Sequence, residues 1–141
     1  MKFWDSSAIV ATIVSEGRSG VVRQLLRDDD QVAAWWGTRV ECAAGLFRRW
    51  REGRFDVQTL ENSLRGLALS ARGWREVPAS DLVRNKAFRC LRLHRLRTGD
   101  ALQLAAALEW VDSAPGGSSF VTLDDQLGDA ARAEGFTVLP A

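Results

Sequence analysis

The sequence predicts a single three-layer α/β/α domain over residues 1–141, in which helices cover both faces of a central parallel sheet. Short apolar runs alternate with segments of helical periodicity along the whole chain, which is typical of parallel sheets. The run VAAWW at 32–36 lacks polar alternation, as expected for a strand buried on both faces. A chain of 141 residues is also long enough to bury one core.

In the first half of the chain, short apolar runs are expected as strands, and apolar residues three or four apart as helices. The expected elements are a strand at 3–5, helices at 6–15 and 20–27, a strand at 32–36, and helices at 38–51 and 57–69. Thr38 is the expected cap of its helix and Gly53 the residue that stops it. Gly66 interrupts the last helical pattern, and Trp36 is expected to be buried.

In the second half of the chain the same criteria continue the alternation. The expected elements are a strand at 74–77, a helix from Ser80 or Asp81, a helix at 101–110, a strand at 119–123, a helix at 125–134 and a closing strand at 137–139. Pro115, Gly116 and Gly117 mark a turn before the second of these strands. Ligands of such sheets bind outside the carboxyl ends of the strands, so the residues that follow strands are candidates for a functional site.

Four separated acids stand where a strand or turn leads into a helix: Asp5, Glu41, Asp100 and Asp124. Gathered in one cleft, they would repel each other, and some would stay protonated unless a cation neutralised them. Oxygen ligands favour Mg²⁺ or Mn²⁺, so the pattern predicts a divalent metal site. The structural alternative is capping or a favourable charge in a first turn. That alternative is weakest for Asp5, which closes a buried strand.

Polar neighbours of these acids are candidate supports. Ser6 and Ser7 follow Asp5, while Thr122 and Asp125 flank Asp124. A hydroxyl group can orient a carboxylate or a bound water. Alternatively, the two serines cap the helix that follows them.

The positive charge is almost all arginine and is unevenly placed, although the net charge is only +1. One group precedes Asp100 and contains Arg89, Arg92, Arg95 and Arg97. Arginine binds phosphate through two parallel hydrogen bonds, so we expect this group to contact a nucleic-acid backbone. The alternative is a solvated helix face.

Composition excludes several other classes of protein. No stretch approaches the roughly 20 apolar residues that cross a bilayer, and the N-terminal segment lacks the features of a signal peptide. Cys42 and Cys90 fit neither a disulfide framework nor metal-ligand spacing. We therefore expect a cytoplasmic protein with no membrane partner.

Four segments in order resemble the motifs of the PIN-domain family, and in particular those of VapC toxins from toxin–antitoxin pairs. They are DSSAIV at Asp5, VECAAGL at Glu41, RTGDALQLAAAL at Asp100 and FVTLDDQLGDAARAEGF at Asp124. Each motif alone is weak, whereas four in order over nearly the whole chain are specific. The chain departs from the family at Gly99, where alanine is frequent, and at Gln103, where histidine is frequent.

The resemblance implies a PIN-like fold and a metal-dependent endoribonuclease that uses Mg²⁺ or Mn²⁺. Asp5, Glu41 and Asp100 would bind one ion directly or through water, and Asp124 would support it or help to hold a second. A water activated there would attack phosphorus in line and leave a 5′-phosphate and a 3′-hydroxyl. The implied partners are an RNA substrate, a small VapB-like antitoxin that keeps the enzyme inactive, and a second copy of the chain in a homodimer.

Three alternatives remain open. A free-standing PIN nuclease of RNA processing would lack the antitoxin, and a non-catalytic PIN-like binding module would lack one of the four acids, all of which are present. A phosphohydrolase or receiver-like domain would need an Asp-x-Asp pair or a downstream lysine, but Ser7 stands in place of the second aspartate and the only lysines are Lys2 and Lys86. Transfer RNA, ribosomal RNA and messenger RNA are all open as targets.

Overall fold

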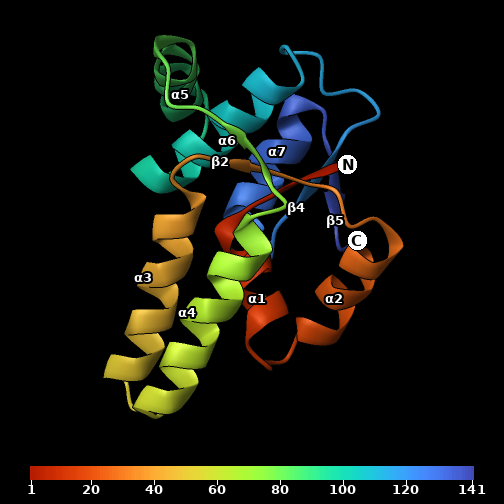
Figure 1. Ribbon diagram of the computed structural model, residues 1–141. Helices are drawn as coiled ribbons and strands as arrows, with labels where there is room; N and C mark the ends of the chain where they lie inside the picture. The colour runs from red at the N-terminus through yellow and green to blue at the C-terminus, as the bar shows by residue number, and fades with distance from the viewer.

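The computed structural model describes residues 1–141, which form five strands and seven helices (Figure 1). The strands are β1 (Lys2–Trp4), β2 (Val32–Trp35), β3 (Arg75–Val77), β4 (Ser119–Val121) and β5 (Thr137–Leu139). The helices are α1 (Ser6–Ile13), α2 (Ser19–Asp28), α3 (Thr38–Arg51), α4 (Val57–Ala71), α5 (Asp81–Leu93), α6 (Thr98–Trp110) and α7 (Asp125–Glu134). None of the helices combines the length and the apolar character that a membrane span requires.

The sheet is parallel throughout, with the strand order β3-β2-β1-β4-β5. Phe3 in the central strand β1 lies opposite Ala33 of β2 and Phe120 of β4. The chain therefore starts in the middle of the sheet, builds one half through β2 and β3, and returns to build the other half through β4 and β5. The strand order reverses between β1 and β4, and in open parallel sheets this reversal is where ligands bind.

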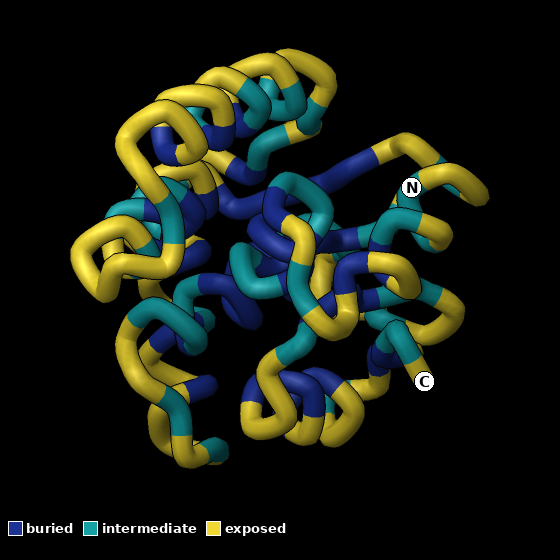
Figure 2. The backbone as a smooth tube through the Cα atoms, turned by 90° about the horizontal axis from the view of Figure 1, so that it is seen from below, coloured by how far each residue is buried: buried dark blue, intermediate teal, exposed yellow.

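Successive strand residues face opposite layers, which divides the core in two. Phe3 belongs to a cluster beneath α5, α6 and α7, and its ring stacks on Phe120 with centroids 5.4 Å apart. Trp4 belongs to a second cluster beneath α1, α2, α3 and α4. Buried residues follow the sheet and the inner helix faces, while the outer faces are exposed (Figure 2). The three-layer α/β/α class predicted from the sequence is confirmed.

Helix α6 is the most enclosed of the helices. Its side chains at Ala101 and from Gln103 to Leu108 are all buried. The alanines among them let α5 and the sheet approach the helix axis closely from several sides. Its first turn is therefore held on a rigid support, which matters because that turn carries Asp100.

Three local expectations differ from the structure. Thr38 is the first residue of α3 and makes no capping bond; its side chain is instead fully buried. Trp36 is 59% exposed, because β2 ends at Trp35 and the next residue enters a turn. Helix α4 continues through Gly66 to Ala71. A Cβ at Gly66 would meet Ile13 of α1 at 3.7 Å, an ordinary contact distance, and the glycine does not break the helix.

An ion-pair cluster joins the end of α5 to α7. The Glu134 carboxylate accepts hydrogen bonds from Arg89 at 2.9 Å and from His94 Nε2 at 2.7 Å. Burial acts to raise the pKa of Glu134, but the hydrogen bonds from His94 and Arg89 outweigh it, and the pKa is lowered. Arg89, one of the arginines expected to contact nucleic acid, is therefore already paired.

The substitution Glu134→Gln is expected to lower the free energy of unfolding by about 1 kcal/mol at pH 7, since Arg89 is half exposed and solvent screens the pair. Because the folded-state pKa is depressed, this stabilisation is full above the ordinary value of 4.5 and is lost as the pH falls through the folded pKa. Urea unfolding at pH 7 and pH 3 measures the difference. A deficit of equal size at both values would contradict the ion-pair account, and Asp129→Asn, at an exposed pair with Arg132, is the control.

Candidate active site at the carboxyl ends of β1 and β4

Asp5 directly follows β1 and is buried, with 3% of the residue exposed. Its backbone N–H donates to the Val121 carbonyl oxygen of β4 at 3.0 Å, which places it beside the reversal of strand order. Its carboxylate accepts from the Ser7 backbone N–H at 3.3 Å and so caps α1. The alternative that the serines cap this helix is wrong, because Asp5 itself occupies the cap position.

Hydroxyl groups hold the Asp5 carboxylate in one orientation. Oδ2 accepts from Ser7 Oγ and from Thr122 Oγ1, the latter at 2.7 Å, and Oδ1 accepts from Ser6 Oγ at 3.3 Å. Burial nevertheless raises the pKa of Asp5, because these hydrogen bonds compensate only in part for lost solvent. The charged form of Asp5 therefore lacks a counter-ion within the protein.

The same hydroxyls tie the loop after β4 to the start of α1. Ser7 Oγ accepts from the Leu123 backbone N–H at 2.9 Å, and Thr122 Oγ1 accepts from the Asp124 backbone N–H at 3.0 Å. Asp124 in turn caps α7, since its Oδ1 accepts from the Leu127 N–H at 2.8 Å. Asp124 is thus held against the Asp5 side of the site by backbone contacts.

Glu41 reaches the site from the first turn of α3. Its Oε2 accepts from Ser6 Oγ at 3.2 Å and from Gln103 Nε2 at 3.4 Å. Burial is the main cause that raises the pKa of Glu41, and the negative charges of Asp5 and Asp100 add to it. Ser6 therefore bridges two carboxylates that repel each other.

Asp100 lies half-buried in the first turn of α6. Burial raises its pKa first, the charges of Asp124 and Asp5 raise it further, and Arg97 acts in the opposite direction. A Cβ at Gly99 would lie 3.6 Å from Glu41 Oε1, an ordinary contact distance. The four acids predicted from the sequence thus come from four separate segments and share one electrostatic environment.

Two observations bear on whether these acids could hold a divalent cation. No three His, Cys, Asp or Glu side chains are placed so that they could hold a metal ion together, yet burial raises the pKa values of Asp5, Glu41 and Asp100, and neighbouring acids add to the rise for Glu41 and Asp100. A cation relieves such a conflict. Mg²⁺ usually retains several waters and takes only one or two carboxylates, which suits acids that approach without converging.

Gln103 is the residue that the sequence reasoning missed. It is fully buried, donates to Glu41, and exchanges hydrogen bonds with the Thr38 hydroxyl at 3.1 and 3.3 Å. It follows Asp100 by three positions on α6, a spacing that places both on one helix face. That spacing in the sequence could have indicated that Gln103 lies beside the acids.

The arginines of the predicted nucleic-acid group are divided in the structure. Arg97 precedes α6 and lies close enough to Asp100 to oppose the rise of its pKa. Arg89 is paired with Glu134, and Arg92 and Arg95 are exposed. Asp125 is exposed in the first turn of α7 and lines a small hollow with Asp124.

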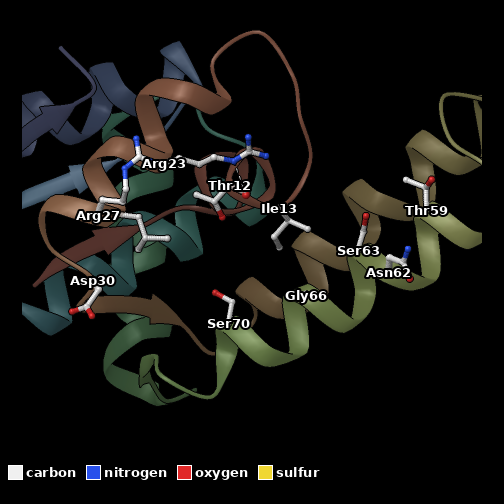
Figure 3. Close-up of a pocket in the computed structure, with 11 residues that line it drawn as sticks. Thr12, Ile13, Arg23, Arg27, Asp30, Thr59, Asn62, Ser63, Gly66 and Ser70 are labelled. Carbon is white, nitrogen blue, oxygen red and sulfur yellow. Dashed lines mark hydrogen bonds between the residues drawn. The ribbon is translucent and has the colours of Figure 1, made fainter.

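A wide hollow is separate from the acids. It has a volume of about 980 Å³ and lies between the end of α1, helix α2 and one face of α4 (Figure 3). Ile13 projects towards it from α1, and Asn62, Ser63 and Gly66 line it from α4 (Figure 3). None of the four predicted acids belongs to its lining, so the candidate active site is the smaller region around Asp5.

Comparison with solved structures identifies the fold. VapC20 of Mycobacterium tuberculosis, described as a toxin that cleaves the sarcin–ricin loop, superposes with a TM-score of 0.69 at 18% identity over 97% of each chain. PAE2754 of Pyrobaculum aerophilum gives 0.67 at 19% identity, covering 97% of this chain and 81% of that one. A toxin–antitoxin complex of Klebsiella pneumoniae gives 0.61 at 14% identity over 88% and 87%. No protein-family model and no curated protein matches the chain. The PIN-like fold indicated by the motifs is confirmed, and the chain shares it with a VapC toxin.

Proposed function

We propose that the protein is a metal-dependent endoribonuclease and the toxin of a toxin–antitoxin pair. The main support for this proposal is the environment of Asp5. Its buried carboxylate is held by three hydroxyl groups and lacks a counter-ion. It lies with Glu41, Asp100 and Asp124 where the strand order reverses. The likeness to VapC20, described as a toxin that cleaves the sarcin–ricin loop, supports RNA as the class of substrate. Mg²⁺ or Mn²⁺ is the proposed cofactor.

The proposal gives each residue a role. Asp5, Glu41 and Asp100 would hold the ion, directly or through water, and Asp124 would support it or help to hold a second ion. Ser7 and Thr122 fix the direction in which Asp5 points, and Ser6 spaces Asp5 from Glu41. When bound, the ion would supply Lewis acidity, which activates a water and stabilises charge on the phosphate.

The test is cleavage of total RNA by the purified protein with Mg²⁺ or Mn²⁺, with EDTA, and with Asp100→Asn. Cleavage is expected to stop in EDTA and to slow by a factor on the order of 100 or more in the variant, since metal catalysis contributes several kcal/mol to the barrier. Asp129→Asn, on the exposed side of α7, should cleave normally. Products are expected to carry 5′-phosphates. Unchanged cleavage in EDTA and in Asp100→Asn would refute the proposal.

Two partners are part of the proposal. The similarity to a chain of a toxin–antitoxin complex supports an inhibitory antitoxin, and expression of the protein is expected to arrest growth unless that antitoxin is expressed with it. A homodimer has support from apolar side chains that α5 leaves in solvent, namely Leu82, Phe88, Leu91 and Leu93. Growth that continues when the protein is expressed alone would favour a free-standing nuclease of RNA processing.

A further inference from the structure

A second hollow leads away from the carboxylates between α1 and α3. Its volume is about 440 Å³, and its inner end is lined by Ser6, Ser7 and Glu41. Its outer end carries Glu16 and three arginines: Arg18, Arg48 and Arg49. We call this hollow the arginine cleft. One end of it thus belongs to the candidate active site, and the other is rich in cations.

One arginine and the single carboxylate of the outer end neutralise each other. The Arg49 guanidinium donates to both oxygens of Glu16 and to the Gly45 carbonyl oxygen, the latter at 2.9 Å. The hydrogen bond from Arg49 is the main cause that lowers the pKa of Glu16, so the pair stays ionic. The Arg49 guanidinium and the Glu16 carboxylate therefore use most of their hydrogen-bonding capacity on each other.

Arg18 and Arg48 have no such partner. Both are exposed, and neither side chain makes a hydrogen bond or ion pair within the chain. A Cβ at Gly45 would lie 3.8 Å from Arg48 Nη2, so the Arg48 guanidinium lies beside the α3 backbone one turn from its own Cα. The cleft therefore keeps two unpaired guanidinium groups beside the acids.

Helix periodicity aligns one of these arginines with the site. Glu41, Gly45 and Arg48 are spaced four and three residues apart, which puts them on one face of α3. At 1.5 Å per residue, Arg48 begins about 10 Å along the helix from Glu41. It is therefore placed to bind a phosphate next to the one that is cut, rather than the cut phosphate itself.

Arg18 lines two hollows, each of which includes residues that hydrogen-bond to Asp5. It lines the arginine cleft and also a hollow of about 220 Å³ that contains Thr122 and Asp124. Glu41 lines the first hollow and Asp124 lines the second, so a strand that occupied both hollows would pass Arg18 with one acid of the set at each end.

We propose that Arg18 and Arg48 bind backbone phosphates of an RNA strand that runs along the arginine cleft into the carboxylate site. The inference rests on the proposed ribonuclease function and specifies where its substrate lies. Guanidinium groups match phosphate oxygens in geometry and charge. Two unpaired arginines also offset the repulsion between an anionic strand and the acids, which a nuclease with an acidic centre must overcome.

The test measures how RNA binding depends on salt. A fluorescein-labelled single-stranded RNA is titrated with the Asp100→Asn protein in Mg²⁺ at several salt concentrations, and binding is followed by anisotropy. Adding Arg18→Ala or Arg48→Ala should weaken binding about tenfold, the worth of one charged hydrogen bond. Each should also reduce the slope of log K against log salt by about 0.7, the value for one lost phosphate contact on a single strand. Arg48→Lys should retain the slope, because it keeps the charge.

Arg72→Ala is the matched control, because Arg72 is exposed and unpaired at the end of α4, outside both hollows. Thermal unfolding checks that every variant is folded. If the wild type cleaves RNA but the Arg18 and Arg48 variants keep the parent slope, the inference is wrong and the proposed function stands. If those variants lose affinity only for an inhibitory protein partner, the cleft is a protein-docking surface and the inference is also wrong. Failure of the wild type to cleave in the presence of metal counts against the proposed function, whatever the slopes.

Discussion

Asp5→Asn is expected to slow RNA cleavage by a factor on the order of a thousand while making the metal-free protein more stable. The loss follows from removing the charge that would hold the ion, since metal catalysis contributes several kcal/mol to the barrier. The shape and contacts of the side chain are retained. The amide oxygen can accept from Ser7 and Thr122 in place of Oδ2, and the amide N–H can face Ser6.

The gain in stability follows from the direction of the pKa shift. Burial raises the pKa of Asp5 above its ordinary value of 3.8, so ionisation costs more in the folded state than in the unfolded state. The cost is absent below pH 3.8, where both states are protonated, and reaches its full size above the folded pKa. In EDTA at neutral pH the amide should raise the free energy of unfolding by about 0.5–2 kcal/mol, the usual range for one stabilising substitution.

Cleavage rates and urea unfolding in EDTA measure the two effects on one preparation. Asp129→Asn, on an exposed stretch of α7, should change neither quantity. A variant that is inactive and less stable than the wild type at pH 7.5 would mean that Asp5 serves mainly as a structural cap. A variant that is more stable but fully active would remove Asp5 from the catalytic set.

Gln103→Glu is expected to destabilise the metal-free protein by about 3–5 kcal/mol at pH 7.5, the usual cost of an uncompensated buried charge. The amide of Gln103 donates to Glu41 at 3.4 Å within a fully enclosed part of α6. The substitution replaces that donor with a second carboxylate, so a hydrogen bond to the Glu41 carboxylate is replaced by repulsion between two negative charges. No other substitution proposed above is expected to change the free energy of unfolding as much.

The destabilisation should shrink in acid. The new carboxyl group would have a raised folded-state pKa, and its penalty therefore grows as the pH rises above the ordinary value of about 4.3. Urea unfolding in EDTA at pH 5 and pH 7.5 provides the comparison. Gln103→Met, with similar length and no charge, should cost only about 1–3 kcal/mol for the unpaired hydroxyl of Thr38 and the lost donor to Glu41. Equal deficits for the two variants at pH 7.5 would contradict the electrostatic explanation.

The fold was largely readable from the sequence because its signals are local. The run at 32–36 predicted a doubly covered strand, and the closing strand and α7 have the predicted limits. The acids that follow β1 and β4 could be found by the general rule that parallel sheets bind ligands at strand ends. Their grouping with Glu41 and Asp100 rested on the shared position of the four acids, where a strand or turn leads into a helix, and on the order of the motifs. No local pattern tells how far apart two helices lie.

What the sequence could not predict depends on packing between distant segments. Trp36 belongs to an apolar run, yet the strand ends one residue earlier and the side chain faces solvent. Threonine often caps a helix, yet the Thr38 hydroxyl accepts a hydrogen bond from Gln103 of α6. The arginines before Asp100 formed the denser cluster in sequence, whereas the unpaired ones in the arginine cleft are 30 positions apart and become neighbours only through the fold.

The hydroxyl of Thr122 on the Asp5 carboxylate has a consequence for synthesis of the protein. A chain made from its N-terminus presents Asp5 almost at once, but the side chains that complete its surroundings are translated near the end. No shortened product that stops before β4 can assemble the site, and a nascent chain still attached to the ribosome is inert until that segment emerges. The proposed ribonuclease activity would therefore appear only once the ribosome that makes the chain has almost finished it.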